Sequence, residues 1–427
     1  MKKIIALLLA LVMVVGLVAC GGTTETPATE APAANNDAPA TEAPAAAEVE
    51  EITLKVWAPQ EDQVDESSWL IQVQKAFEEA HPEYKITWDN GVCPEGDAAN
   101  MVTADPAAAA DVYMFANDQL GTLLQAGALA KLGGSFLEQV QADVSATYVN
   151  TVTSTDGGVY GFPVAPNTWF MYYNKELVGD ADLTSLESIL EKGIVAFEIK
   201  NSWYLPSFFF AAGGSLFGET GADAAAGIKF GGEAGYAATN AVLDLLENPN
   251  FKVDGDGYGN TGLKNGTVVA YFSGSWDYAG LFEALGEDLG AVAAPTVMIN
   301  GEAKQLKAYA GSKAVGVNPN AANMKAAMQF AAFLASADSQ LLRFQLRNIT
   351  PAVTALSENA DVAASIVAVA ESATMAYASV AQPTIAEMNP VWGPVGTFGT
   401  NIADGMVTRD NVVESVDAMD AQLNGGL

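Results

Sequence analysis

The sequence has very few of the side chains that metal sites, disulfide frameworks and nucleic-acid surfaces need. It contains one histidine and two cysteines in 427 residues. A zinc site with several ligands, an iron–sulfur cluster or a disulfide-stapled fold requires more, so we expect no metal and no such framework. The chain has only 19 basic residues against 51 acidic ones, which gives a formal net charge of −32. So acidic a chain repels phosphate backbones and anionic lipid headgroups, and we expect no nucleic-acid partner.

The motifs of several large enzyme classes are missing too. We find no G-x-S-x-G elbow, no Walker loop and no H-E-x-x-H motif. His81, the only histidine, precedes a proline at the predicted end of a helix, which favours a surface position. The run at 254–259 begins like a calcium loop, but Tyr258 and Asn265 stand where ligands are needed, so a solvated turn is expected. No catalytic residue is predicted, although glycoside hydrolysis needs only two carboxylates and the chain has many.

The N-terminus has the pattern of an export signal. Lys2 and Lys3 precede an uncharged apolar run over residues 4–19. A short apolar run behind two lysines is typical of a secretory signal peptide rather than a spanning helix. The run ends in Leu-Val-Ala-Cys, which resembles the lipobox of bacterial lipoproteins. The resemblance implies that residues 1–19 are removed and that Cys20 carries lipid; the alternative is an ordinary signal peptide with a chance cysteine.

Residues 20–50 are predicted to be a disordered tether. Between residues 21 and 50 there is no aromatic and no basic side chain. Such a segment cannot bury enough apolar surface to offset the entropy of ordering it. Its prolines stiffen the chain and its acids extend it. A lipid followed by a tether suits a protein that works at the extracellular face of a cell membrane, of the Gram-positive type. Cys93 then has no partner, which predicts a buried or free thiol.

The chain from Ile52 onward alternates between strand and helix patterns. Residues 52–57 alternate like a strand, 67–83 have helical spacing, 84–88 form a second strand and 110–116 a third. This order predicts an α/β fold with a mainly parallel sheet covered by helices. The segment 51–427 is large for one sheet. We therefore expect two α/β lobes facing each other, with the ligand at the carboxyl ends of their strands.

Five of the seven tryptophans are predicted to lie in loops beside amide or acidic side chains. They are Trp57, Trp169, Trp203, Trp276 and Trp392. A flat ring can stack on the apolar face of a sugar, and neighbouring polar groups can bind its hydroxyls. The alternative for each is a core position with a satisfied N–H. Trp69 and Trp88 fall within a predicted helix and strand and are expected in the core. The five together favour a sugar-binding cleft.

Six segments of the chain have a pattern and an order that match one known family. These segments are residues 110–132, 159–178, 202–217, 265–278, 315–334 and 385–399. Over about residues 50–427 the chain resembles bacterial extracellular solute-binding proteins of the maltose/maltodextrin-binding family, the receptors of sugar ABC importers. The resemblance implies a two-lobed, periplasmic-binding-protein-like α/β fold with three hinge crossovers and an interlobe cleft. It also implies a monomer without a cofactor that closes on an oligosaccharide and presents it to an ABC-transporter permease.

The resemblance also implies where the lobes begin and end. The expected N-lobe comprises about residues 51–165 and 295–347, and the expected C-lobe about 167–293 and 350–427. The three crossings between them are then expected near Pro166–Asn167, Ala294–Pro295 and Asn348–Pro351. Three strands in parallel permit bending and resist twisting, so the lobes should close like a hinge.

Ten residues fall on positions of the family's cleft. They are Trp57, Glu61, Asp62, Phe115, Asp118, Gln119, Asn167, Trp203, Trp276 and Trp392. Asp118 matches an aspartate that binds sugar hydroxyls, whereas Gln119 replaces an arginine and Asn167 a glutamate. Phe115 stands at the position of a stacking tryptophan. The retained aromatic platforms favour a maltodextrin, and the altered polar set leaves another oligosaccharide open. A surface glycan-degrading enzyme with the same cleft and a peptide-binding receptor are the other hypotheses.

Overall fold

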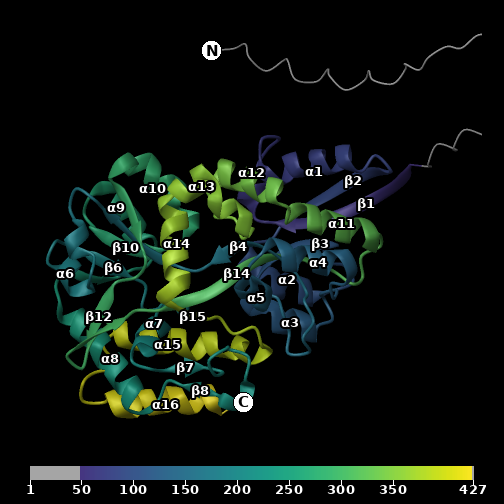
Figure 1. The fold of residues 1–427 in the computed structure, drawn as a ribbon. Coiled ribbons are helices and arrows are strands. Elements are labelled where there is room, and N and C mark those ends of the chain that lie inside the picture. The colour runs from purple at the N-terminus through teal and green to yellow at the C-terminus, as the bar shows by residue number, and fades with distance from the viewer. Residues whose placement is uncertain (1–48, 426–427) are drawn as a thin grey trace, which may run out of the picture. The chain divides into compact units, whose positions relative to one another are not determined.

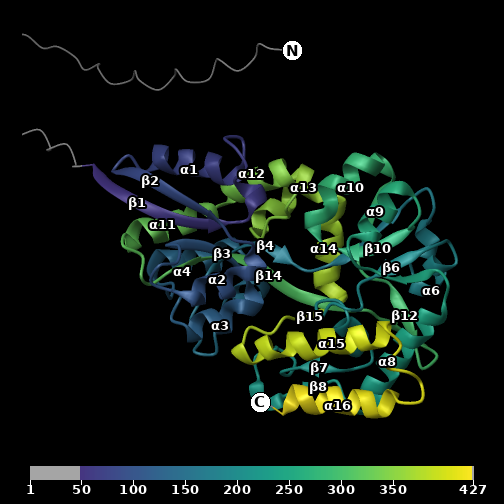
Figure 2. The same ribbon diagram turned by 180° about the vertical axis from the view of Figure 1, so that it is seen from behind.

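The computed structural model describes residues 49–425 of the chain, drawn from two opposite sides in Figures 1 and 2. The predicted signal peptide, Cys20 and nearly all of the predicted tether lie outside these residues. Within the described range, no helix is both long and apolar enough to cross a membrane.

One sheet combines four strands from residues 50–167 with two strands from later in the chain. Its strand order is β15-β14-β3-β1-β2, and β4 also pairs with β14. β1 is parallel to β2 and β3, whereas β14 is antiparallel to β3 and β4. The strands are β1 (Glu50–Ala58), β2 (Tyr84–Val92), β3 (Val112–Ala116), β4 (Phe162–Asn167), β14 (Ala308–Val317) and β15 (Ser379–Ala381). The expected parallel order therefore holds for β1–β3 and fails where β14 and β4 join the sheet.

Amphipathic helices cover this sheet. In α1 (Trp69–Ala80) the buried side chains Trp69, Leu70, Val73 and Phe77 recur at helical spacing, and the helix ends at His81, as expected. Every second residue of β1 from Ile52 to Ala58 is buried against them. The other helices of this lobe are α2 (Ala98–Ala104), α3 (Leu120–Gln125), α4 (Gly134–Asp143), α5 (Ala146–Thr151), α11 (Met324–Leu334) and α12 (Ala337–Arg347).

A second sheet has the order β11-β5-β10-β6-β9. Both of its faces are apolar: Met171 on β5 joins one core cluster, and Tyr172 joins another with Val367 and Ala370 of α14. Its strands are β5 (Phe170–Asn174), β6 (Val195–Phe197), β9 (Phe251–Val253), β10 (Ala270–Ser273) and β11 (Leu289–Val292). Two hairpins pair β7 (Ser215–Leu216) with β8 (Ile228–Lys229) and β12 (Thr296–Ile299) with β13 (Glu302–Gln305).

The remaining helices belong to the second lobe or lead into it. They are α6 (Leu186–Leu190), α7 (Pro206–Ala211), α8 (Gly232–Glu247), α9 (Tyr258–Asn265), α10 (Tyr278–Leu285), α13 (Ala360–Ala364), α14 (Ile366–Tyr377), α15 (Trp392–Ala403) and α16 (Val412–Asn424).

The chain passes between the two sheets three times. The first passage follows Asn167, where β4 leaves one sheet and β5 enters the other, close to the expected position. The second runs along β14. Its first residues, including Tyr309, pack in the core of the second lobe, and Ala314–Val317 pack in the first. The third passage leads from α12 through α13 to α14.

Two expected lobe boundaries are wrong. Residues 295–306 do not belong to the first lobe, because Val297, Ile299 and Leu306 are buried in the core of the second. The apolar side chains of the β12–β13 hairpin face that core, so the crossing comes later, at β14. The second lobe also does not begin at residue 350. Ala352 is buried in the first core, and Val353 forms a β-bridge with Val144 of the first lobe.

Candidate functional site

Three aromatic rings from three distant segments meet where β14 passes between the lobes. The ring centroids of Trp203 and Tyr309 are 5.1 Å apart, those of Tyr309 and Trp392 5.8 Å, and those of Trp203 and Trp392 6.2 Å. We call these three residues the aromatic cluster. Tyr309 is buried, whereas Trp203 and Trp392 are half-buried. The sequence therefore brings two of its predicted stacking tryptophans together, with a tyrosine that it did not single out.

Local turns hold the two tryptophans in place. The backbone N–H of Trp203 donates to Asn201 Oδ1 at 2.8 Å, which closes a tight turn before α7. The indole N–H of Trp169 donates to the carbonyl of Trp203 at 3.2 Å. Trp169 itself is fully buried, so this predicted loop tryptophan is a core residue that supports Trp203. Trp392 is the first residue of α15, directly after the 3₁₀ turn η9 (Ala386–Val391).

Buried polar atoms without a partner gather beside the aromatic cluster. Tyr309 Oη, Asn117 Nδ2 and both polar side-chain atoms of Gln382 make no hydrogen bond within the described residues. The close approach of Gln382 and Asn117 depends on Gly311, where a Cβ would collide with both side-chain oxygens. Each unpaired buried polar group costs about 1–3 kcal/mol. Several unpaired polar atoms close together indicate a site where a polar ligand or water molecules supply the missing hydrogen bonds.

Asp118 lies next to these atoms, in the 3₁₀ turn η3 (Asn117–Gln119) that follows β3. Its side chain is partly exposed, and burial raises the pKa of its carboxyl group to about 6. The charge of Asp118 contributes to a pKa of Tyr309 well above the ordinary value, behind the larger effect of burial. The carboxylate therefore lies near Tyr309, and as an ion it can accept hydrogen bonds from a ligand.

Trp276 offers a separate aromatic surface. It lies in the 3₁₀ turn η6 (Ser275–Asp277) of the second lobe and is 43% exposed. Lys313 Nζ of β14 stands 5.7 Å from the centre of its ring. Gly274 lies directly under the ring, where a Cβ would collide with it. Trp276 is thus exposed and fixed in orientation, as a stacking platform requires.

Three of the predicted site residues are buried in the first lobe and already have partners within it. Phe115 is fully buried, against Gly161 and Gly316. Gln119 Oε1 accepts from the backbone N–H of Ala99 at 2.6 Å, and its amide nitrogen donates to the Gly96 carbonyl. Both side chains therefore serve the packing of the lobe, and the structure contradicts a ligand role for them.

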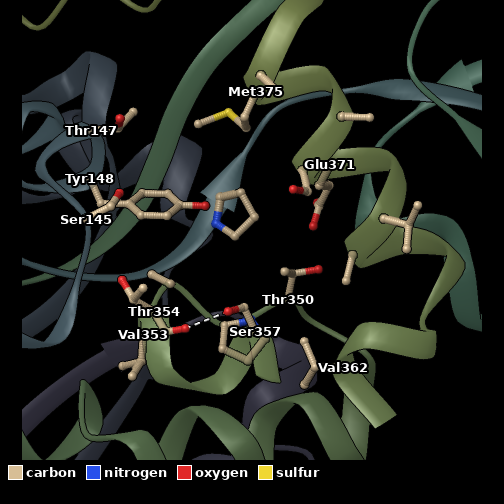
Figure 3. Close-up of a pocket in the computed structure, with 18 of the residues that line it drawn as sticks. Ser145, Thr147, Tyr148, Thr350, Val353, Thr354, Ser357, Val362, Glu371 and Met375 are labelled. Carbon is tan, nitrogen blue, oxygen red and sulfur yellow. Dashed lines mark hydrogen bonds between the residues drawn. The ribbon is translucent and has the colours of Figure 1, made fainter. Parts of the chain in front are cut away.

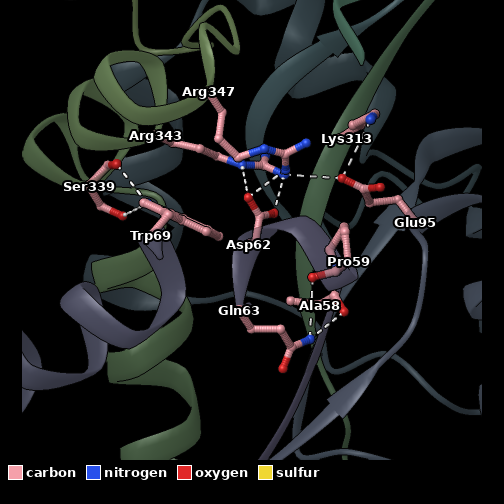
Figure 4. A network of polar contacts seen from close by, with 10 residues as sticks. All are labelled: Ala58, Pro59, Asp62, Gln63, Trp69, Glu95, Lys313, Ser339, Arg343 and Arg347. Atoms are coloured by element: carbon pink, nitrogen blue, oxygen red, sulfur yellow. Dashed lines mark hydrogen bonds and ion pairs between the residues drawn. The ribbon is translucent and has the colours of Figure 1, made fainter. Parts of the chain in front are cut away.

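Asp62, the third of these residues, belongs to a buried ion-pair network (Figure 4). It has no exposed surface, and its oxygens accept from Arg343 Nη2 at 2.6 Å and from Arg347 Nη1 at 2.7 Å. Arg343 also reaches Glu95 Oε1 at 3.3 Å, and Lys313 reaches the same oxygen at 3.5 Å. With both oxygens occupied, Asp62 is not available to a ligand. Its sequence neighbour Glu61 is exposed.

Burial alone raises the pKa of Glu95, but Lys313 and Arg343 outweigh it and hold the pKa at about 2. The sequence contained a signal for this network. Two of the three arginines of the chain, Arg343 and Arg347, stand four residues apart and so share one face of α12. Arg343 also lies 4.8 Å from the ring of Trp69, which is buried as predicted.

Asn167 and Trp57 have less defined surroundings. Asn167 ends β4, is 8% exposed and pairs across the sheet with Gly311, near Asn117 and Gln382. The ring of Trp57 lies against Gly91 on β2, with Lys55 Nζ 5.6 Å from its centre, and does not join the aromatic cluster. Trp88 is half-buried against the first core, and Cys93 is a buried free thiol.

The chain forms two α/β lobes joined by three crossings. The aromatic cluster and the unpartnered polar atoms lie at these crossings, which is the architecture of a two-lobed binding protein. The comparison with family models agrees: residues 72–369 match the bacterial extracellular solute-binding proteins, and the chain belongs to that family.

Relatives and solved structures extend this result. The chain is 27% identical over 405 residues to a maltooligosaccharide ABC transporter solute-binding lipoprotein of Streptococcus pneumoniae, covering 88% of this chain and 86% of the relative. It is 26% identical over 334 residues to a galactooligosaccharide-binding protein of Bacillus subtilis, covering 71% and 76%. One solved structure, described as being with acarbose, is 44% identical with a TM-score of 0.85, covering 88% and 99%. The maltodextrin-binding protein MalE1 of L. casei, without ligand, is 24% identical with a TM-score of 0.79 over 88% and 99%, and shows the same fold.

Proposed function

We propose that the chain is the substrate-binding component of an ABC importer and that it binds maltooligosaccharides. The observation that carries this proposal is the aromatic cluster beside buried polar atoms that lack partners. Stacked rings suit the apolar faces of linked glucose units, and the unpaired groups suit their hydroxyls. The pneumococcal relative is named for maltooligosaccharides, and the structure with 44% identity is described as being with acarbose, which support an oligosaccharide ligand.

The residues proposed to contact the sugar differ in part from those expected at first. Trp203, Trp392 and Trp276 would stack on glucose units. Asp118 would accept hydrogen bonds from hydroxyls, and Asn167 would add an amide beside it. We add Tyr309, Gln382 and Asn117, whose free donors and acceptors lie at the same place. We leave Trp57 and Glu61 as weaker candidates, because they lie apart from the aromatic cluster.

The proposed signal to the permease is closure of the lobes. Asp118 belongs to the first lobe, and Trp203, Trp276 and Trp392 belong to the second. A sugar that touches both lobes binds the closed arrangement more tightly, and this difference in affinity drives the closure. The lobes also meet at Gly121 of α3, whose α-carbon stands against the backbone of Ile385 and Ala386. We expect the protein to act as a monomer and without catalysis.

The proposed anchor is a lipid on Cys20. The pneumococcal relative is named a lipoprotein, and the Leu-Val-Ala-Cys run of this chain has the matching pattern. Cys20→Ser should release the protein from the extracellular face of the membrane without changing sugar affinity. Fractionation of cells that express each form measures this, and retention of the mutant in the membrane would contradict lipidation.

Calorimetric titration with maltose, maltotriose and maltopentaose tests the sugar site. Trp203→Ala and Trp392→Ala should each weaken binding ten- to hundred-fold, since stacking an aromatic ring on a ligand is worth ~1–3 kcal/mol. Trp88→Ala is the matched control: it removes the same half-buried ring, which packs against Phe330 of α11 instead. Equal losses in all three variants would refute the site. New reducing ends after incubation with maltodextrin would favour a glycan-degrading enzyme instead.

A further inference from the structure

A cavity lies between the two lobes (Figure 3), and its lining includes none of the three residues of the aromatic cluster. Its volume is about 740 Å³, within the range of small-molecule sites. Tyr148 of α5 and Pro166 of β4 line it from the first lobe, residues 350–357 close one end, and α14 closes the other side. We call it the hinge cavity, because it adjoins the first and third crossings of the chain. Most of its lining is apolar, including Val353 and Met375.

One acidic side chain of this lining is buried without a partner. Glu371 of α14 is 1% exposed, and neither of its carboxyl oxygens makes a hydrogen bond within the described residues. Figure 3 shows Glu371 facing Thr350, with the ring of Tyr148 across the cavity. The Thr350 hydroxyl is also buried and unpartnered. Two carboxyl oxygens and one hydroxyl group thus stand together in a largely apolar wall.

Among the described residues, no cationic side chain forms an ion pair with Glu371. Burial raises the pKa of Glu371 to about 7, although the neighbouring hydroxyls of Thr350 and Ser275 and the charge of Lys313 oppose the rise. Lys313 is directed elsewhere, because it pairs with Glu95. A buried carboxylate needs both a countercharge and hydrogen-bond donors.

We propose that the hinge cavity is a second binding site, for a small organic amine with an apolar body. A primary ammonium has three donors and no acceptor. It therefore matches the two oxygens of Glu371 and the hydroxyl oxygen of Thr350. The rest of such a molecule would lie along Val353 and Met375, and the ring of Tyr148 can attract the charge. Charge-assisted hydrogen bonds to a carboxylate are about twice as strong as neutral ones, which favours an amine over an alcohol of the same shape.

Because the lining comes from both lobes, occupancy of the hinge cavity should depend on how the lobes are arranged. α5 and β4 pack in the first lobe, whereas α14 packs on the second sheet. A change in the lobe angle alters the distance between these walls. The amine and the sugar should then change each other's affinity by the same factor, since coupling between two sites is reciprocal. This last step rests on the proposed sugar-driven closure, whereas the amine site does not.

Binding of benzylamine and n-butylamine, measured by ligand-observed NMR on the full mature chain, tests the site. Benzyl alcohol and n-butanol are the uncharged controls. Both amines should bind, and both alcohols should bind at least ten-fold more weakly. Amines that fail to bind, or alcohols that bind equally well, would overturn the proposal.

Two variants separate the site from general attraction to an acidic surface. Glu371→Gln keeps the shape of the side chain and should weaken amine binding at least ten-fold. Glu358→Gln removes the same charge from an exposed position on the neighbouring 3₁₀ turn η8 (Thr354–Glu358) and should leave it unchanged. Thr350→Val is a second variant that tests the site if Glu371→Gln folds poorly, and it should also weaken amine binding. Equal affinity in all variants would overturn the assignment to this cavity.

Repeating the titration with saturating maltotriose tests the coupling. A changed amine affinity, with an equal factor in the sugar affinity at saturating benzylamine, supports it. If the sugar binds and the amine affinity stays the same, the two sites are independent and the coupling is refuted.

Discussion

Replacing Asp62 distinguishes a structural role from the ligand role that the sequence suggested. Asp62→Asn removes the charge that Arg343 and Arg347 share inside the first lobe. Breaking a buried ion pair from one side typically costs ~3–5 kcal/mol, because the remaining charge is left without compensation. Arg343 keeps Glu95 at 3.3 Å, and an asparagine oxygen can still accept a hydrogen bond. We therefore expect a loss near the low end of that range, about 3 kcal/mol.

Urea denaturation followed by tryptophan fluorescence measures this loss, and calorimetry with maltotriose measures the affinity of the same variant. Glu61→Gln is the matched control, because it removes one negative charge from the adjacent, exposed position. Asp62→Asn should be destabilised with little change in affinity, whereas Glu61→Gln should keep its stability. A stable Asp62→Asn variant with at least ten-fold weaker sugar binding would refute the structural interpretation and restore the original prediction.

Three further predictions concern pH and the contact between the lobes. Sugar affinity should reach its maximum above the pKa of Asp118, about 6, and should fall about ten-fold by one pH unit below that pKa, because the carboxylate becomes protonated. Calorimetry at several pH values measures this, and the affinity of Asp118→Asn should not change with pH. The pKa of Glu95 in the folded state, about 2, lies below its ordinary value of 4.5, so ionised Glu95 stabilises the fold fully above pH 4.5 and loses this effect as the pH falls toward 2. Denaturation midpoints measured against pH should lack this part of the acid dependence in Glu95→Gln. Gly121→Val should push the lobes apart, because a Cβ at Gly121 would lie 2.6 Å from the backbone carbonyl carbon of Ile385. Small-angle scattering should show a larger radius of gyration and calorimetry a weaker sugar affinity; if neither quantity changes, the contact between the lobes is contradicted.

The sequence predicted the fold well because its strands and helices have strong local patterns. The alternation of β1 and the helical spacing around Trp69 each follow from short-range periodicity. The positions of Trp203 and Trp392 beside turns were also predicted from the sequence, and their role in sugar binding stays a prediction. The α/β class and the two lobes then followed from the order of the elements.

The errors concern residues whose roles depend on distant partners. Asp62 occupies a family position, but Arg343 and Arg347, far along the chain, bind both of its oxygens. Tyr309, which we propose as a further sugar contact, was not singled out because it lies inside a strand, where nothing local distinguishes a site residue from a core residue. The lobe boundary near residue 295 failed for a similar reason: a hairpin can pack on either lobe, and only the tertiary structure decides which.

The path of β14 also bears on when the protein can fold. In the first sheet β14 lies between β3 and β4, yet it is the last of these strands to be made, at residues 308–317. Until Val317 has been synthesised, the segment from β1 to β4 lacks an inner strand, and the edge of the wholly buried β3 stays open. Sheets that need such distant pairings form slowly. A nascent chain of this kind therefore remains without a complete first lobe through most of its synthesis, which would keep it unfolded if it is exported as we propose.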